Sequence, residues 1–346
     1  MTRGIGYYVH HHGAGHLHRA RAIARHLARP VTLIGTGIGE AADAAVLDLP
    51  DDRISARFDG ADAAATRPDM LHYAPIDHDG IRERVARFTR WIAETQPALI
   101  VVDVSVEIAL LARLASVPLV YVRLNGRRTD PPHLEAFRSA QALIAPYHAD
   151  LDDPHMPEWV RERTRYFPGL IARMPQGGER GEDILIVAGK GGTSLSPEPI
   201  VAMANACPDL RIVVAGPVDP IATAPDTLTF LGWSDDVDRR IAMAGCVVGA
   251  AGNGLVGRVL ASGAPFICLP EDRPFDEQRV QAAQLARHGA AVVSDRWPEA
   301  QQWPELIARA KALAATRPDH LHHGDGAARA ADWIDSIAER FDRVAA

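Results

Sequence analysis

Two side chains in the first third of the chain have the types and places needed for acid–base chemistry. His16 follows the apolar stretch Ile5–His10, and Asp103 closes the apolar stretch Leu99–Asp103. If both stretches are parallel strands, their carboxyl ends meet at one edge of a sheet, where ligands bind in open sheets. Asp103 would then fix the tautomer and orientation of His16, which would act as a general base toward a hydroxyl group. The simpler alternative stays open, in which His16 caps its turn and Asp103 caps the following helix.

Two glycine-rich turns, one near each end of the chain, offer places for a phosphate group. Each turn follows an apolar stretch and leads into a helical pattern, over His18–Ala28 in the first case and Gly254–Ser262 in the second. The start of a helix offers free backbone N–H groups and the positive end of the helix dipole. The positions concerned are Gly13, Gly15, Gly252, Asn253 and Gly254.

Two further segments carry polar groups just after apolar stretches. In Val187–Ser194, the backbone N–H groups and the Thr193 and Ser194 hydroxyls could hold a phosphate, and Lys190 would add a positive charge. This segment lacks the Gly-Lys-Ser/Thr ending of a P-loop, and a plain flexible loop is the alternative. In Glu271–Ala282, the acids and amide at the start of a helical pattern could bind a polyhydroxylated ligand or simply cap the helix.

Several histidines cluster beside the first glycine-rich turn, but their spacing does not predict a metal site. An extended segment points alternate side chains to opposite faces, and the glycines interrupt any helical spacing of ligands. One or two of these side chains could instead line a cleft. The cluster comprises His10, His11, His12, His16 and His18.

Apolar runs and helical patterns alternate along the whole chain, which predicts an α/β fold with two doubly wound parallel sheets. A stretch with two prolines and four glycines, 167–182, separates two series. We therefore expect one domain over 1–168, a hinge over 169–182, and a second domain over 183–346 that includes the last helical pattern, 326–344. The expected strands are Ile5–His10, Val31–Gly35, Leu99–Asp103, Leu119–Arg123, Ala142–Ala145, Ile184–Ala188, Arg211–Ala215, Leu228–Leu231, Cys246–Gly249, Pro265–Leu269 and Ala291–Val293.

Composition narrows the class of protein. A net charge of −7 gives no electrostatic basis for binding nucleic acid. The three cysteines, Cys207, Cys246 and Cys268, lie in or beside apolar segments, which is typical of reduced thiols in a cytoplasmic protein. No apolar run approaches the roughly 18 residues of a membrane span, so only a peripheral membrane contact stays open.

Taken in order, the motifs resemble those of the GT-B glycosyltransferases, and most closely family 28, which is typified by the peptidoglycan enzyme that adds N-acetylglucosamine to a lipid-linked acceptor. The matching sequence letters are G-A-G-H, V-A-G-K-G-G-T-S, G-W-S-D-D-V, A-A-G-N-G-L-V-G-R and P-F-D-E-Q-R-V-Q-A. The resemblance implies two Rossmann-like domains facing each other across a cleft. It covers most of the C-terminal half of the chain and two patches of the N-terminal half.

The resemblance also implies roles for single residues. His16 matches a histidine near the acceptor and the reacting sugar carbon, and Asp103 matches its aspartate partner. The segment 233–237 matches the nucleobase-reading segment, which places Asp235 and Asp236 there and not in a metal site. The donor-binding positions implied are Gly191, Gly192 and Thr193 beside the diphosphate, Trp233, Ser234 and Val237 at the base, Gly252, Asn253 and Gly254 at the helix start, and Glu277 and Gln278 at the sugar hydroxyls.

One position departs from the family pattern. Family members usually carry a glutamate four residues after the position of Gly254, where it binds the ribose hydroxyls, and this chain has Arg258. Arginine cannot accept hydrogen bonds from a diol, although it can bind a phosphate. The departure puts a uridine-diphosphate donor in doubt.

Three functions are consistent with these patterns. The first is an inverting glycosyltransferase that needs neither a metal nor another cofactor and moves a sugar from a nucleotide-diphosphate donor to an unknown acceptor hydroxyl. The second is a nucleotide-sugar hydrolase of GT-B fold, because G-A-G-H-L-H-R also resembles such an enzyme. The third is a protein that binds a nucleotide or sugar without catalysis, and Arg258 keeps this alternative open.

Overall fold

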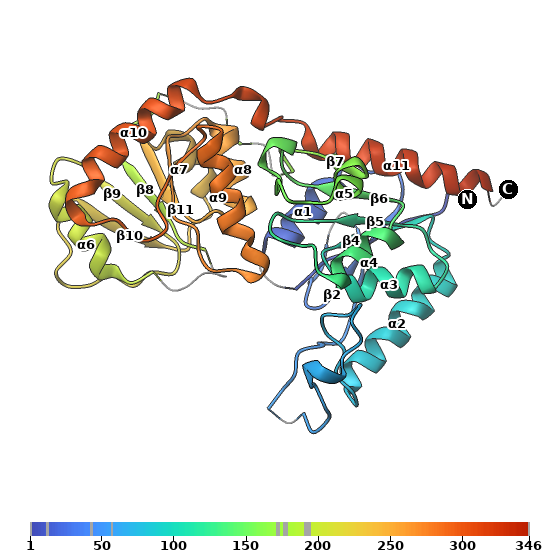
Figure 1. Cartoon of the computed structure of the whole chain (residues 1–346). Helices are drawn as coiled ribbons and strands as arrows, with labels where there is room; N and C mark the ends of the chain where they lie inside the picture. The colour runs from blue at the N-terminus through green and yellow to red at the C-terminus, as the bar shows by residue number, and fades with distance from the viewer. Residues whose placement is uncertain are drawn as a thin grey trace.

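The protein forms two lobes, each built on a parallel sheet (Figure 1). This computed structural model describes residues 2–11, 14–41, 44–56, 58–170, 174–175, 179–189 and 195–344. We call the first sheet with its helices the N-terminal lobe and the second sheet with its helices the C-terminal lobe.

Seven described strands form the first sheet, in the order β3-β2-β1-β4-β5-β6-β7, and every pairing between them is parallel. The central strands are continuous apolar runs that are buried throughout. Their alternate residues serve two cores: Tyr7 and Val101 pack on one face, Tyr8 and Val102 on the other. The strands are β1 (Ile5–Tyr8), β2 (Val31–Gly35), β3 (Ala45–Asp48), β4 (Leu99–Asp103), β5 (Leu119–Val122), β6 (Ala142–Ala145) and β7 (Thr164–Tyr166).

Helices cover both faces of this sheet. One face carries α2 (Asp79–Thr95), α3 (Val106–Leu114), α4 (Pro131–Ser139) and α5 (Glu158–Glu162). The opposite face carries α1 (Ala14–Ala24) and the last helix, α11 (Gly326–Val344). Residues 326–344 were expected to belong to the second domain. In the structure α11 instead packs along the N-terminal lobe, because its apolar residues complete the core beside α1 (Figure 1).

The second sheet has the order β10-β9-β8-β11-β12-β13 in the described chain, again with parallel pairings. One face packs against α7, α8 and α9, and the other against α6 and α10. The strands are β8 (Ile184–Val187), β9 (Ile212–Ala215), β10 (Leu228–Gly232), β11 (Cys246–Gly249), β12 (Phe266–Cys268) and β13 (Val292–Val293). The helices are α6 (Pro197–Ala206), α7 (Val237–Met243), α8 (Asn253–Ser262), α9 (Glu277–Arg287) and α10 (Trp303–Thr316).

The predicted α/β class with two parallel sheets is confirmed. Two strands were not predicted, β3 and β7, and both are short strands at the edges of the first sheet. The residues of β3 are partly or fully exposed, and β7 contains an arginine, so neither shows the continuous apolar run of a buried strand. The first helix begins at Ala14 and not at His18, which places His16 in its first turn.

The chain crosses between the lobes twice, once before β8 and once between α10 and α11. The two crossings touch through glycines that leave no room for a side chain. A Cβ atom on Gly169 would lie 1.8 Å from the carbonyl oxygen of His323, and one on Gly326 would lie 2.1 Å from that of Pro168. Within the described residues, no helix combines the length and apolar character required to cross a membrane.

Candidate active site

The structure brings His16 and Asp103 together. His16 lies in the first turn of α1, just after β1, and Asp103 is the last residue of β4, the strand that pairs with β1. Nδ1 of His16 lies 2.9 Å from Oδ1 of Asp103. Nδ1 also lies 3.0 Å from a terminal nitrogen of Arg19, which donates to the same carboxylate oxygen at 2.8 Å. Because a carboxylate can only accept and Arg19 already has this acceptor, we assign the proton of His16 to Nδ1. Nε2 then keeps the lone pair that a general base requires.

Arg19 completes this group and was not predicted from the sequence. Its Nε and a terminal nitrogen donate to the two oxygens of Asp103, at 3.0 and 2.8 Å. Burial alone would raise the pKa of Asp103, but the charges and hydrogen bonds of Arg19 and His16 hold it below its usual value. Arg19 follows His16 by three residues, which places both on one face of a helix only because α1 begins at Ala14, four residues before the predicted start.

The turn after Asp103 is strained. Val104 has a φ of 57°, a left-handed conformation that is an outlier for a β-branched residue. Its N–H donates to the carbonyl of Val122, and its own carbonyl accepts a 2.6 Å hydrogen bond from the Tyr121 hydroxyl. Such strain persists where the surroundings over-determine it, as they do at many functional sites.

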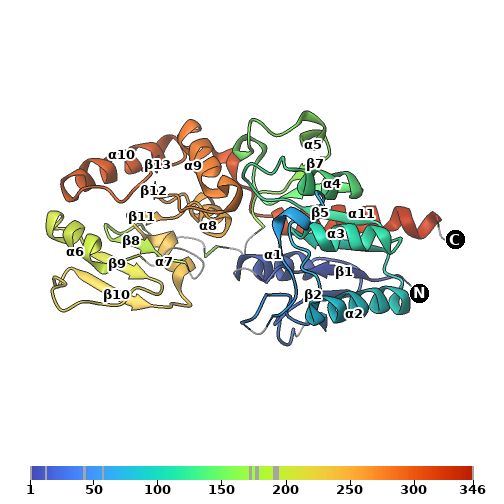
Figure 2. The same ribbon diagram turned by 60° about the horizontal axis from the view of Figure 1, so that its bottom comes forward.

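A cavity of about 370 Å³ is lined by residues of both lobes, among them residues of α1 and of the start of α8. Figure 2 shows α1 of the N-terminal lobe beside α8 of the C-terminal lobe. Six of the predicted site residues line the cavity. Gly15 and His16 come from α1 of the N-terminal lobe, and the C-terminal lobe contributes Asn253, Gly254, Arg258 and Glu277. Gly252 is the N-cap of α8. The general base candidate and a helix N-terminus therefore face the same space.

Asn253 has an unusual environment at this helix start. Its side-chain oxygen accepts a hydrogen bond of 3.1 Å from the amide of Gln281. Its Nδ2 is buried and has no hydrogen-bond partner within the part of the chain that is described. A buried donor without a partner is rare in folded proteins, so this amide offers a free N–H donor at the cavity wall.

Arg258 lines the same cavity, one turn further along α8. Its Nε donates to Oδ1 of Asp238 on α7 at 2.5 Å, and a terminal nitrogen donates to the carbonyl of Gly254 at 3.0 Å. The guanidinium is therefore tied to α7 and to the first turn of α8. The departure from the family pattern is accompanied by an acid on the neighbouring helix.

Glu277 and Gln278, adjacent in sequence, have different surroundings. Glu277 lines the cavity and pairs with Arg128 of the N-terminal lobe at 2.8 Å. Gln278 is 5% exposed, and its side-chain oxygen accepts from the backbone N–H groups of Ala251 and Glu271. In this structure Gln278 joins the turn before α8 to the loop after β12.

The remaining predicted residues lie elsewhere or outside the described chain. Trp233 is 57% exposed, and Ser234 bonds to Asp236 beside the start of α7 at Val237. None of these residues appears among the described residues that line the cavity. The positions outside the described residues are Gly13, Gly191, Gly192 and Thr193, together with His12, Lys190 and Ser194.

Comparison with known proteins identifies the architecture. No family model matches the chain. A curated relative from Clavibacter michiganensis subsp. michiganensis (strain NCPPB 382), a UDP-N-acetylglucosamine–N-acetylmuramyl-(pentapeptide) pyrophosphoryl-undecaprenol N-acetylglucosamine transferase, is 29% identical over 200 residues, which cover 54% of this chain. The match covers 52% of the relative, so this chain spans about half the length of the curated relative it matches.

Solved structures match over almost the whole chain. MurG of Acinetobacter baumannii aligns with a TM-score of 0.69 at 16% identity, over 96% of this chain and 99% of its own. The calicheamicin glycosyltransferase CalG4 aligns with a TM-score of 0.66 at 19% identity, over 98% and 99%. This chain has the GT-B fold. The predicted resemblance to family 28 is likewise confirmed, because the curated relative is a transferase of that kind.

Proposed function

We propose that this GT-B protein is an inverting glycosyltransferase that uses a nucleotide-diphosphate sugar and no metal ion. One observation carries the proposal: the His16–Asp103 pair and the N-terminus of α8 face one cavity from opposite lobes. The curated relative and the structural neighbours, which are named as glycosyltransferases, support the sugar-transfer class.

In the proposed mechanism, Nε2 of His16 takes the proton of the acceptor hydroxyl as its oxygen attacks the anomeric carbon. Attack from the face opposite the nucleotide inverts that carbon. Asp103, held ionised by Arg19, stabilises the imidazolium that forms, while the departing diphosphate carries new negative charge toward the start of α8. The fixed dipole and N–H groups of that helix end, with the amide of Asn253, would stabilise this charge without a metal.

The first experiment is a thermal-shift screen against uridine, deoxythymidine, guanosine and adenosine diphosphates and their sugars. A ligand at 100 times its dissociation constant adds about 2.7 kcal/mol to the free energy of unfolding, which is easily measured. A shift with one nucleotide series supports the donor site. No shift with any series argues against it.

An activity assay then separates the three functions. Nucleotide release that requires an acceptor supports a transferase, and steady release without an acceptor supports a hydrolase. Binding without release supports a non-catalytic protein. For a transferase, the configuration of the product by NMR tests inversion, and unchanged rates in a metal chelator test metal independence.

A further inference from the structure

The two lobes meet at a contact that joins the loop after β5 to the loop before α9. We call this the lobe contact and define it as 126–128 against 275–277. Arg127 N–H donates to the carbonyl of Phe275 at 2.7 Å. Gly126 has a φ of 104°, and a Cβ atom there would lie 2.6 Å from the same carbonyl oxygen. The backbones of the two lobes therefore touch directly.

At the centre of the lobe contact, Arg128 holds one oxygen of Glu277. A terminal nitrogen of Arg128 donates to Oε2 of Glu277 at 2.8 Å, and the two side chains are only 9% and 21% exposed. Low exposure strengthens this charged hydrogen bond relative to a surface pair. Oε1 is the oxygen left to accept a hydrogen bond from a ligand in the cavity that Glu277 lines.

Arg128 is itself fixed by three further contacts. Its Nε donates to the carbonyl of Asn125 at 3.0 Å, another nitrogen lies 3.1 Å from Nε2 of His133, and its guanidinium covers the ring of Phe275 at 4.9 Å. A guanidinium held on several sides loses little further freedom when it binds a carboxylate. Arg128 is therefore preorganised to orient Glu277.

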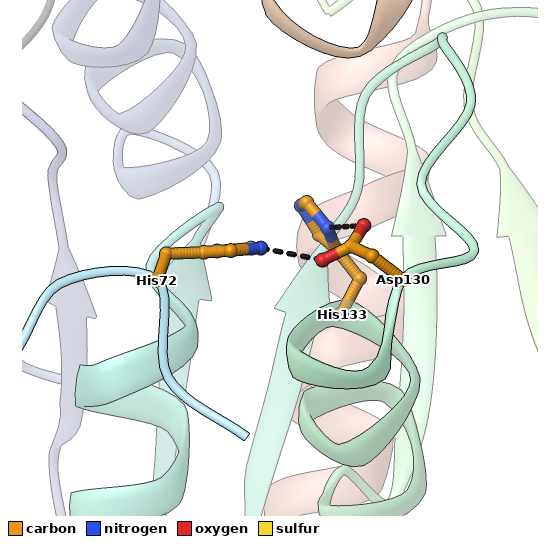
Figure 3. A group of neighbouring side chains, drawn as sticks. All are labelled: His72, Asp130 and His133. Carbon is orange, nitrogen blue, oxygen red and sulfur yellow. Dashed lines mark hydrogen bonds and ion pairs between the residues drawn. The ribbon is translucent and has the colours of Figure 1, made fainter. Parts of the chain in front are cut away.

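Next to Arg128, three side chains form a row of hydrogen bonds: His133, Asp130 and His72. Nδ1 of His133 donates to Asp130 at 2.7 Å, and Nε2 of His72 lies 2.5 Å from the other oxygen of Asp130, so that both rings point toward the one carboxylate (Figure 3). Burial, together with the charge of Arg128, lowers the pKa of His133 to about 3. His133 thus stays neutral, and its Nε2 accepts from Arg128.

These residue types could also hold a metal ion, but their hydrogen bonds favour the row described above. The nitrogen–oxygen distances are those of hydrogen bonds. Since Nε2 of His133 accepts from Arg128, the proton occupies Nδ1, the atom that faces Asp130 and that a metal would need. His72 is also anchored, because its backbone N–H donates to Glu107 of α3 at 2.9 Å.

The geometry points to Arg128 as a positioning residue for the sugar-binding carboxylate. It holds Glu277 from the opposite lobe, so that Glu277 is oriented toward the donor sugar only while the lobe contact is formed. Phe275 and Asp276 adopt φ values of 61° and 53°, a strained backbone that the N-terminal lobe supports. This inference rests on the proposed function, because it gives Glu277 a sugar as its ligand.

The test compares binding of UDP with binding of UDP-N-acetylglucosamine by titration calorimetry in Arg128→Gln. We expect the dissociation constant of the sugar nucleotide to rise about ten-fold or more, as for loss of a charged hydrogen bond, and that of UDP to change little. Glu277→Gln should do the same, and the double variant should lose no more than either single variant. Equal losses for both probes, no loss for either, or additive losses would overturn the positioning role.

Arg127→Gln is the matched control. Arg127 pairs with Asp276 in the same contact, at 3.3 Å, but both side chains are largely exposed at 68% and 45%. We expect both dissociation constants to stay within about two-fold of the wild type, because exposed pairs contribute little. A loss as large as that of Arg128→Gln would show that any charge removed from the loop weakens binding, and would overturn the specific role of Arg128.

Hydrogen exchange in the ligand-free protein separates this inference from the proposed function. We expect Arg128→Gln, and not Arg127→Gln, to speed amide exchange in peptides that contain 124–128 and 275–279. Unchanged exchange would overturn the dependence on the lobe contact. If the wild type binds neither probe while Arg128→Gln still speeds exchange, the donor is not a uridine nucleotide and the lobe contact stands. The same titrations with the nucleotide series that gives a thermal shift then decide the sugar role of Glu277, and no shift with any series overturns it.

Discussion

At the scale of single residues, Asp103 contacts His16, which lines the cavity. Asp103 is fully buried, and its two oxygens accept from Arg19 and face His16. A buried carboxylate stays ionised only when a nearby positive charge compensates it, and Arg19 provides that charge. The same arrangement that stabilises the fold here also orients the side chain proposed as the general base.

His16→Ala should abolish most turnover while it leaves the fold intact. Loss of a general base lowers kcat by about 100- to 10,000-fold. The fold should survive because Arg19 still pairs with Asp103, although the His16 side chain is only 12% exposed. Steady-state kinetics with a thermal melt measures both effects. His26→Ala, an exposed histidine just after α1, is the control and should behave as the wild type. Wild-type turnover in His16→Ala would exclude the base role.

Asp103→Asn should weaken the fold and flatten its dependence on pH. The folded pKa of Asp103 lies below the unfolded value of about 3.9, so its contribution is full above that value and is lost as pH falls toward the folded pKa. The variant should lose about 3–5 kcal/mol at pH 7, because Arg19 stays buried without its partner. Urea denaturation at pH 7 and near pH 3 measures both. The control Asp79→Asn removes an exposed acid, and an equal change there would contradict the prediction.

At the scale of elements, α7 and α8 are joined on the side of the cleft that we propose binds the nucleotide. Arg258 joins the two helices through its hydrogen bond to Asp238 and also donates to the carbonyl of Gly254. A family-like glutamate at 258 would face Asp238 and repel it. The arginine and the aspartate are therefore best understood as one unit, which a single substitution disrupts.

Arg258→Glu should lower the melting temperature, and adding Asp238→Asn should restore it. The single variant places two carboxylates side by side, whereas the double variant removes one of the charges. We expect the double variant to bind uridine diphosphate more tightly than the wild type, because its glutamate is free to accept from ribose hydroxyls. Thermal melts and calorimetry measure these effects. Unchanged or weaker binding would give Arg258 a ligand role of its own.

At the scale of the whole molecule, the last helix makes the N-terminal lobe discontinuous in sequence. Residues of α11 share a core with Tyr7, Ile23 and Val101, and Ala28 N–H donates to Asp335 at 2.8 Å. The chain therefore has to cross between the lobes twice, at the glycines that press the two crossings together. The lobes also touch at the lobe contact, and Tyr147 and Leu151 of the N-terminal lobe share a core with residues of the C-terminal lobe.

Ile334→Ala should destabilise the N-terminal lobe by about 2–5 kcal/mol, because Ile334 is fully buried in the core of that lobe. A fragment of residues 1–170 should likewise aggregate, and linking it to 326–344 should keep it soluble. Denaturation of the full chain and solubility of the two fragments are the measurements. A soluble, folded fragment without α11 would contradict this account of the lobe.

The amino-acid sequence was enough to predict the repeated strands and helices, the parallel sheets, and the placement of His16 and Asp103 at the carboxyl ends of two strands. These follow from local patterns, because an apolar run specifies a buried strand and strand order places carboxyl ends at one edge. Four features became visible only in the folded protein: Arg19 compensates Asp103, Arg258 pairs with Asp238, Arg128 reaches Glu277, and α11 packs on the first lobe. Each of these depends on the relative placement of separate elements, which is set by the packing of side chains distant in sequence and leaves no periodic signal in the chain.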